Sequence, residues 1–231
     1  MRKQKPPDEE CIDTARALAS LLDRCEREED VQQFLTKHLW ILLDSFAFPW
    51  AVREGIPKFK LGNEFVTDFL VVTGQSFRYE FILVEIEPPN ESLFTKAGTP
   101  AKRLSQAVKQ VSDWNGWIAH NTTFFRREVV RSLREIDASL SKEERWTRGI
   151  EHGVDQIDPD SRGAKKFFPP TYPPSVAFKI IIGRRDGLST EDNERRASLC
   201  QMAGNSLEIV TYDRLIQAAT SPSDRRWTVG D

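Results

Sequence analysis

Three acidic residues lie in two apolar segments that a short polar stretch separates. Asp68 lies in F-V-T-D-F-L-V-V, and Glu85 and Glu87 lie in Y-E-F-I-L-V-E-I-E. A carboxylate in an apolar strand is costly unless a cation or a hydrogen-bond donor meets it. Carboxylate oxygens are also the ligands that Mg²⁺ prefers in proteins. The three acids therefore predict a metal site that uses Mg²⁺ or Mn²⁺.

The direction of these side chains depends on how the two strands pair. Successive side chains alternate between the faces of a strand, so Glu85 and Glu87 share one face. Asp68 joins that face in any antiparallel register whose paired residue numbers add up to an odd value. A two-residue turn at Gly74 and Gln75 meets this condition, and so does a turn four residues longer. The sequence leaves both registers open, and the longer turn sets Asp68 directly opposite Glu85.

A bound magnesium ion keeps several waters, so one or two carboxylates suffice to hold it against a substrate phosphate. Asp68 and Glu85 are the expected metal ligands. Glu87 is expected to orient a metal-bound water or to bind a second ion. The alternative is an ion-paired strand face without a metal, whose cations would be Lys58, Lys60 or Lys102.

Hydrophobic periodicity predicts one α/β domain with a central mixed β-sheet flanked by helices. The domain covers residues 1–231, with a core at about 28–220, an N-terminal helix at 9–27 and a long irregular loop at 151–174. The predicted core elements are helices at 28–43, 104–118, 123–140, 190–203 and 213–219, and strands at 50–57, around Asp68, around Glu85, at 176–183 and at 207–211.

Composition and charge limit the possible classes of protein. The 231 residues are 29% charged and 39% hydrophobic, which is typical of a globular domain. No apolar run approaches the ~20 residues of a spanning helix, and no secretory signal is recognised. We therefore expect a cytoplasmic protein without membrane contact. The three cysteines lack C-x-x-C spacing, which argues against a disulfide framework or a zinc site.

The order of these motifs resembles the PD-(D/E)xK nuclease superfamily. An acidic helix precedes the D…E-x-E hairpin, and a helix that carries Gln follows it. Within that superfamily, the chain from about 28 to 215 is similar to the Shedu anti-phage nuclease domain, also described as DUF4263. The matching segments are E-x-D-V-Q-x-F-L at 28–35, T-D-F at 67–69, V-E-I-E-P-P at 84–89, A-V-K-Q at 107–110, I-I-I-G-R-R at 180–185 and I-V-T-Y-D-R-L at 209–215.

The resemblance implies a restriction-endonuclease-like fold and phosphodiester hydrolysis by a metal-activated water in bacterial defence. It implies metal binding by Asp68 and Glu85, and contact of Gln110 with the water or the substrate phosphate. It also implies an acid on the first core helix. Glu28 extends the apolar stripe of that helix, whereas Glu29 falls on the polar side, so Glu28 is the expected site residue.

One position departs from the superfamily pattern. A lysine usually follows the strand acid by two residues and offsets charge at the reacting phosphate, but here that residue is Glu87. Some members of the superfamily carry Glu there, and a lysine from elsewhere, such as Lys96, Lys102 or Lys109, could serve instead. Otherwise the domain would bind nucleic acid or a protein partner, or act as a regulatory module, without cutting.

The expected partner is nucleic acid, and DNA in particular, with a homo-oligomer or a defence-system protein as further possible partners. The net charge of −2 gives no global attraction for a polyanion. Local basic residues would therefore contact the phosphate backbone. The residues predicted for this role are Lys102, Lys109, Arg184 and Arg185.

Overall fold

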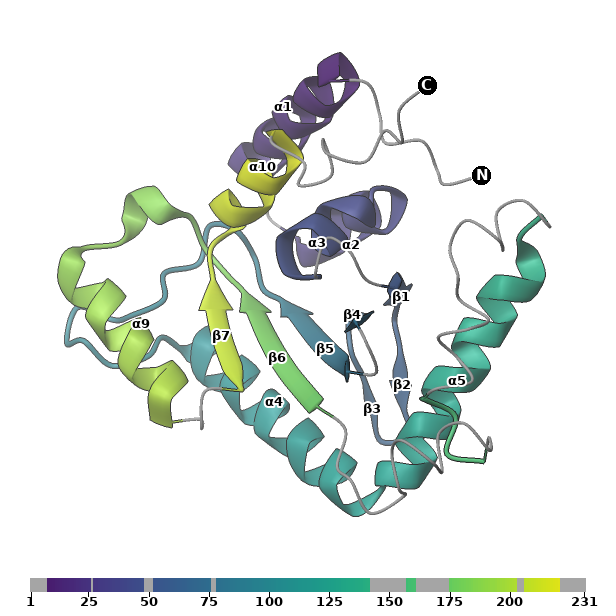
Figure 1. Ribbon diagram of the computed structural model, residues 1–231. Coiled ribbons are helices and arrows are strands. Elements are labelled where there is room, and N and C mark those ends of the chain that lie inside the picture. Colours follow the sequence, from purple (N-terminus) through teal and green to yellow (C-terminus); the bar gives the residue numbers. More distant parts are fainter. Residues whose placement is uncertain are drawn as a thin grey trace.

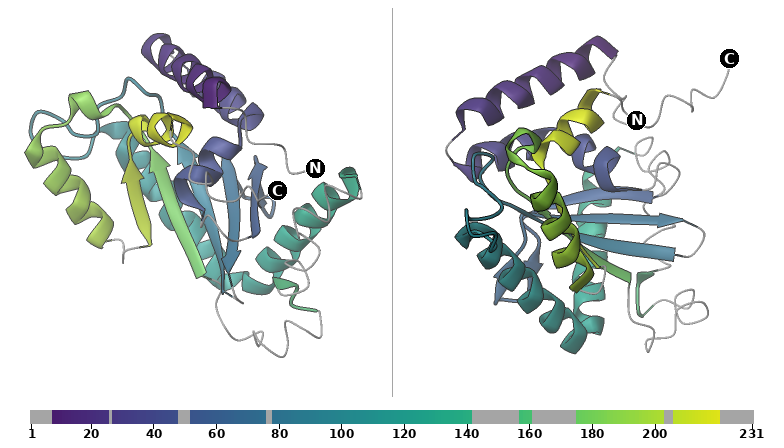
Figure 2. Two further views of the ribbon diagram at one scale, coloured as in Figure 1. Left: turned by 45° about the horizontal axis from the view of Figure 1, so that its top comes forward. Right: turned by 90° about the vertical axis from the view of Figure 1, so that its left-hand side faces the viewer.

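A five-stranded sheet with helices on both faces forms the centre of the molecule (Figures 1 and 2). The computed structural model describes residues 8–25, 27–47, 52–75, 78–141, 157–160, 175–202 and 206–220. The strand order is β1-β4-β5-β6-β7. The bounds are β1 Val52–Pro57, β4 Phe69–Gln75, β5 Arg78–Ile86, β6 Ser175–Ile181 and β7 Leu207–Val210.

The sheet is mixed, as the sequence predicted. The pairs β1–β4 and β4–β5 are antiparallel, whereas β5–β6 and β6–β7 are parallel. The parallel strands β6 and β7 are joined through the helix α9 (Thr190–Met202), which confirms the predicted order of strand, helix and strand between 176 and 211. A second, two-stranded sheet pairs β2 (Lys60–Leu61) with β3 (Phe65–Val66).

The helices form two layers around the sheet. Figure 2 shows α1 and α10 on one side of the sheet and α4 on the other. The bounds on the first side are α1 Asp8–Arg24, α2 Glu28–Lys37, α3 Trp40–Phe46 and α10 Tyr212–Thr220. On the second side they are α4 Lys102–His120 and α5 Thr122–Ser139. A short 3-10 helix, η1 (Arg185–Gly187), follows β6.

Each face of the sheet has its own hydrophobic core. Side chains alternate along β4 and β5, so that neighbouring residues enter different cores. The core on the α4 side contains Leu70, Val72, Phe81, Leu83, Trp114 and Phe125. The core on the α10 side contains Phe69, Val71, Ile82, Val84, Leu35 and Leu215. Glu85 continues the series of Phe81 and Leu83, so its side chain lies on the α4 side.

The single helix predicted at 28–43 is wrong in one respect, because two helices occupy this stretch. Helix α2 ends at Lys37, and the backbone of His38 (φ −121°, ψ 46°) leaves the helical region. The His38 N–H still donates to the carbonyls of Phe34 and Leu35. The break reorients α3, and both Ile41 and Leu42 are fully buried.

The hairpin register is the second of the two that the sequence left open. Phe69 pairs with Val84, so the next position along the hairpin sets Asp68 opposite Glu85. Pairing continues to Gln75 and Arg78 near the tip. Gly74 and Gln75, the two residues of the shorter predicted turn, therefore belong to strand β4.

The prediction that Asp68 lies inside a strand is wrong: it lies at a bend immediately before β4. The pairs Pro57–Phe69 and Lys60–Val66 belong to one continuous register that crosses from the large sheet to the small one. Lys58 is opposite Asp68 at this joint, and its N–H donates to the Asp68 carbonyl at 2.8 Å. Lys58 has φ +49°, the left-handed conformation that most residues avoid. The bend thus places the Cα atoms of Lys58 and Asp68 opposite each other.

Two other expectations concern the rest of the chain. The loop predicted at 151–174 lies outside the described residues except for 157–160. In that short segment the Ile157 carbonyl accepts a hydrogen bond from Arg126 Nε at 3.1 Å, and Arg134 pairs with Asp158 at 2.7 Å. Among the helices described, none combines the length and apolarity that crossing a membrane requires.

Candidate metal and catalytic site

Four acidic side chains gather at the end of β5 that leads into the following loop. Asp68 precedes β4, Glu85 lies in β5, Glu87 directly follows β5, and Glu28 begins α2. Asp68 and Glu87 are each only 6% exposed, and Glu85 and Glu28 are half-buried. The sheet and α2 therefore bring together all four acids that the sequence assigned to the site.

Asp68 is held by two hydrogen bonds. Its Oδ1 accepts from Lys58 Nζ at 2.6 Å, and its Oδ2 accepts from the Ile86 backbone N–H at 2.9 Å. The Ile86 contact follows from the register, because Asp68 lies opposite the last residues of β5. The Asp68 carboxylate thus provides an acceptor for the Ile86 N–H at the point where the backbone pairing of β4 and β5 ends.

Glu85 is bound from the opposite layer by Gln110 of α4. Gln110 Nε2 donates to Glu85 Oε1 at 2.8 Å. Burial, followed by repulsion from Asp68, Glu87 and Glu28, raises the pKa of Glu85 to about 9, and the Lys58 charge acts in the other direction. Gln106, one turn earlier in α4, is exposed. The structure therefore brings Gln110 to Glu85, whereas its implied contact with a water or a substrate phosphate stays a prediction.

Glu87 has a fixed backbone and a poorly paired side chain. Its N–H donates to the Ile181 carbonyl at 2.9 Å, and its carbonyl accepts from the Tyr212 hydroxyl at 2.7 Å. Its Oε2 is buried and accepts no hydrogen bond from the described residues; Arg103 Nη1 is 3.7 Å away. Burial and the charge of Glu28 raise the pKa of Glu87 to about 7.

Glu28 and Glu29 differ as the helical pattern predicted. Glu28 is half-buried, whereas Glu29 is exposed. Burial and the neighbouring Asp68 carboxylate raise the pKa of Glu28, and the charges of Arg103 and Lys58 oppose this shift. Glu28 is therefore close enough to the other acids for their charge to affect its pKa. No hydrogen bond joins it to them among the described residues.

Three further residues contact the acids, and the sequence did not assign them a functional role. The sequence predicts Lys58 only as a possible neutralising partner of the acids, and no sequence pattern marks Arg103 or Tyr212. Lys58 and Asp68 lie ten positions apart, and only the hairpin register shows that they are opposite. Tyr212 is distant in sequence from Glu87, so no local pattern could reveal their contact.

The lysines that the sequence offered as substitutes for the missing one lie elsewhere. Lys109 pairs with Asp113 at 2.6 Å along the exposed face of α4. Lys96 and Lys102 are exposed, and no ion pair joins either to the acids within the described part of the chain. Lys58 is the lysine in contact with this site.

The alternative of a fully ion-paired strand face is met only in part. The Lys58–Asp68 pair exists, but Lys60 and Lys102 form no such pair in the described residues. Lys58 and Arg103 do not compensate the buried acids, since the pKa values of Glu85 and Glu87 stay raised to about 9 and about 7. A compact group of acids with raised pKa values is typical of functional sites.

The donor set fits a hard divalent cation. All the candidate ligands are carboxylate oxygens, and the buried Glu87 Oε2 has no hydrogen-bond partner among the described residues. In the same part of the chain, no three His, Cys, Asp or Glu side chains already converge on one point. Mg²⁺ needs only one or two carboxylates besides waters, so Asp68 and Glu85 would suffice as protein ligands if such an ion bound here.

The predicted nucleic-acid contacts lie in two places. Lys102 and Lys109 are exposed on α4. Arg184 and Arg185 follow β6, where Arg184 pairs with Asp23 at 2.7 Å and with Asp213 at 3.3 Å. Arg184 is therefore already engaged by carboxylates, whereas Lys102 and Arg185 have no such ion pair among the described residues.

Comparison with known proteins adds the family. Residues 26–216 match the model of the family described as Shedu protein SduA, C-terminal. The chain belongs to the Shedu family. This membership suggests a role in anti-phage defence, and the matched range includes the four acids, Lys58 and Gln110. A comparison of this Shedu chain with curated proteins found no match.

Proposed function

We propose that this Shedu domain is a metal-dependent nuclease of the PD-(D/E)xK type that hydrolyses phosphodiester bonds in DNA. The observation that carries the proposal is the group formed by Asp68, Glu85 and Glu87, which are gathered at one strand end with two raised pKa values. Mutual repulsion of this kind is relieved when a divalent cation binds. The proposed ion is Mg²⁺, which Mn²⁺ can replace.

Asp68 and Glu85 would hold the ion. When bound, Mg²⁺ supplies a water of lowered pKa and positive charge beside the scissile phosphate. Lys58 and the Ile86 N–H fix one carboxylate, and Gln110 fixes the other, so both are oriented before substrate arrives. The Gln110 amide could also donate to the attacking water or to a phosphate oxygen.

Lys58 takes the place of the lysine that the usual pattern has at position 87. Its Nζ is 2.6 Å from Asp68 Oδ1, and the side chain is 53% exposed. A cation that touches a metal ligand and is open to solvent can also reach a substrate phosphate and offset its developing charge. The E-x-E variant therefore does not leave the site without a lysine.

Glu87 then has a different task. A carboxyl group whose pKa is raised to about 7 exchanges protons near neutral pH. Its buried Oε2 has no hydrogen-bond partner among the described residues and could accept a hydrogen bond from the attacking water. We assign Glu87 to orienting that water and taking up its proton.

The test is cleavage of plasmid DNA and of a matched RNA by the purified chain with Mg²⁺ or Mn²⁺. We expect cleavage that requires the metal and is lost in both Asp68→Asn and Glu85→Gln. Glu29→Gln is the control, since Glu29 is exposed beside the site residue Glu28. Cleavage that survives both site substitutions, or no cleavage of either substrate by the native chain, would contradict the proposal.

The second candidate is a nuclease-like module that binds nucleic acid or a protein without cutting. The observation in its favour is that no three acids converge on one point among the described residues. It predicts DNA retention in a binding assay that does not depend on Mg²⁺ or on Glu85. Size measurement in solution, alone and with DNA, would also show whether the chain acts as a homo-oligomer.

A further inference from the structure

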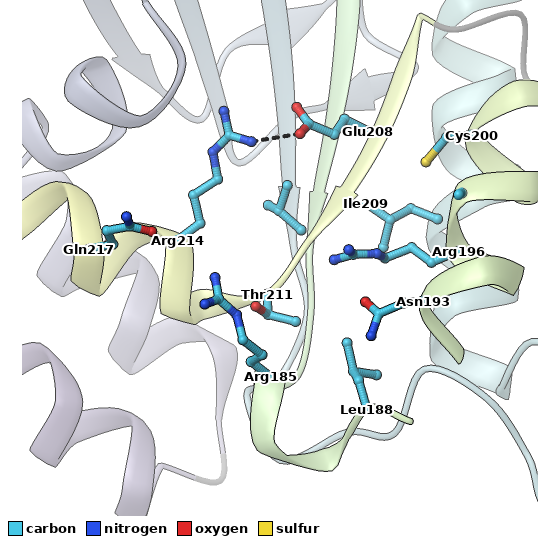
Figure 3. Close-up of a pocket in the computed structure, with 12 residues that line it drawn as sticks. Arg185, Leu188, Asn193, Arg196, Cys200, Glu208, Ile209, Thr211, Arg214 and Gln217 are labelled. Atoms are coloured by element: carbon cyan, nitrogen blue, oxygen red, sulfur yellow. Dashed lines mark hydrogen bonds and ion pairs between the residues drawn. The ribbon is translucent and has the colours of Figure 1, made fainter. Parts of the chain in front are cut away.

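A pocket of about 520 Å³ lies between α9, the edge strand β7 and the start of α10 (Figure 3). Its lining includes Arg185, Asn193, Arg196, Ile209, Thr211 and Arg214. None of the four acids of the candidate catalytic site lines it. The pocket is therefore a separate feature of the molecule.

The pocket exists because α9 packs loosely. None of its 13 residues is buried, whereas α4 buries five side chains against the sheet. Leu199 and Cys200 only partly reach the core. The helix consequently leaves a space beside β7 that side chains do not fill. Protein interiors are normally close-packed, so an unfilled space of this size is a candidate binding site.

The charge of the pocket favours an anion. Arg185 and Arg196 line it, and neither guanidinium forms an ion pair in the residues that the structure describes. The Arg185 backbone N–H does donate to Asp213 Oδ2 at 2.6 Å. Arg214 Nη1 is 2.6 Å from Glu208, but Lys179 shares that carboxylate at 2.7 Å. The lining thus has an excess of positive charge in a chain of net charge −2.

The arginines extend from different walls. In Figure 3 the Arg196 side chain extends from α9 towards β7, and Arg185 lies beside Thr211. Guanidinium groups are suited to phosphate because their planar donors match its oxygens. Two of them on separate elements can hold one phosphate group from two sides.

The strand edge offers further hydrogen bonds. Ser206 and Val210 carbonyls accept from Phe178 and Ile182 of β6, at 2.7 and 3.0 Å. Because alternate residues of a strand direct their peptide groups to opposite sides, the N–H and C=O of Ile209 face away from β6. They add a donor and an acceptor to a wall that is otherwise partly apolar.

We propose that this pocket binds a nucleoside phosphate. Arg185 and Arg196 would hold the phosphate, and the base would lie against Leu188 and the β7 edge with Asn193 as a polar partner. The volume falls within the range of small-molecule sites and exceeds what a lone phosphate needs. The proposal does not depend on nuclease activity.

The test is titration of the full chain with ATP, ADP, AMP, inorganic phosphate and a short single-stranded oligonucleotide, followed by calorimetry. A chelator in every sample keeps divalent metal away from the acids. We expect at least one free nucleotide to bind more tightly than inorganic phosphate and the oligonucleotide. Inorganic phosphate binding as tightly, or oligonucleotide binding alone, would overturn the nucleoside assignment.

Substitutions place the binding in the pocket. Arg185→Met with Arg196→Met should raise the nucleotide Kd at least about tenfold, as expected for loss of charge-assisted hydrogen bonds. Ala197→Trp keeps all the arginines but fills space at an exposed lining position, and should weaken binding similarly. Arg131→Met is the control, because Arg131 is exposed on α5 away from the pocket.

Thermal unfolding without ligand checks that each variant is folded. Nucleotide binding that is unchanged in both the arginine pair and Ala197→Trp, with both variants folded, would overturn the proposal. So would the absence of any nucleotide binding at millimolar concentration. If one variant fails to fold, the other one decides.

Discussion

The acid site and the basic pocket lie on the same sheet but differ in how they are packed. The acids lie between well-packed layers, where Asp68 and Glu87 are 6% exposed. The arginines of the pocket lie beside a helix that buries no side chain. Burial makes like charges costly, so Glu28, Glu85 and Glu87 have raised pKa values. Of the arginines, Arg185 is exposed and Arg196 is half-buried.

The two sites therefore differ in how far their side chains are held in place without a ligand. Hydrogen bonds fix Asp68 and Glu85 without a cation, and repulsion among the acids would favour binding of the proposed cation. The pocket has space and unpaired charge but few contacts that hold its walls. We therefore expect substitutions at the hydrogen-bonded acids Asp68 and Glu85 to change both stability and activity, and substitutions in the pocket to change binding alone.

The largest effect should come from Asp68→Ala. This change removes a predicted metal ligand and leaves Lys58 and the Ile86 N–H without their acceptor. We expect DNA cleavage to fall at least about 10²-fold and the free energy of unfolding to fall by roughly 1–3 kcal/mol. Cleavage kinetics and denaturant unfolding measure the two effects. A protein of unchanged stability would contradict the anchoring of Asp68.

Glu85→Gln should have opposite effects on activity and stability without metal. The pKa of Glu85 is raised to about 9 by burial and by the other acids. Between pH about 4.5 and about 9, the folded state holds a proton on Glu85 that the unfolded state has released. The free energy of unfolding therefore falls as the pH rises through this range. Glutamine removes that cost.

The gain in stability from Glu85→Gln is expected to be roughly 1–3 kcal/mol at alkaline pH and to vanish in acid. Thermal unfolding across pH in a chelator measures it. Mg²⁺ should stabilise the native chain more at high pH than at low pH and should leave Glu85→Gln almost unchanged. If the difference in stability between the native chain and Glu85→Gln did not depend on pH, the raised pKa of Glu85 would be contradicted.

Lys58→Met tests whether this lysine supplies the missing positive charge. Cleavage should fall by about 10–100-fold, and the pH dependence of stability should become steeper, because the charge of Lys58 opposes the raised pKa of Glu85. Lys60→Met is the matched control, since Lys60 is exposed two residues further along the same hairpin. Equal losses in both variants would assign the effect to general surface charge.

The smallest effect should come from Glu28→Gln. Burial and the Asp68 charge raise the pKa of Glu28, but no hydrogen bond from the described residues holds its carboxylate. We expect cleavage to fall by about tenfold or less, with little change in stability. Glu29→Gln should match the native chain in both measurements. A larger loss for Glu29→Gln would reverse the assignment of the two acids.

Local patterns predicted most of the elements and part of the site. The 3.6-residue period of helices placed Glu28 on the side that meets the acids, and the two-residue period of strands placed Glu85 with Phe81 and Leu83. Gln110 came from the resemblance to the nuclease family. The single helix at 28–43 was wrong because its break at His38 depends on burying Ile41 and Leu42 together. Periodicity alone does not contain that packing requirement.

The sequence by itself determined which residues share a face, because side-chain direction along a helix or strand is a local property. It therefore specified the acids and the α/β class. Only the tertiary structure decided the hairpin register, the bend that sets Lys58 against Asp68, the contact of Tyr212 with Glu87 and the pocket beside α9. These features depend on contacts between residues that are far apart in the chain. The free energies of such contacts cannot be inferred from a local sequence pattern.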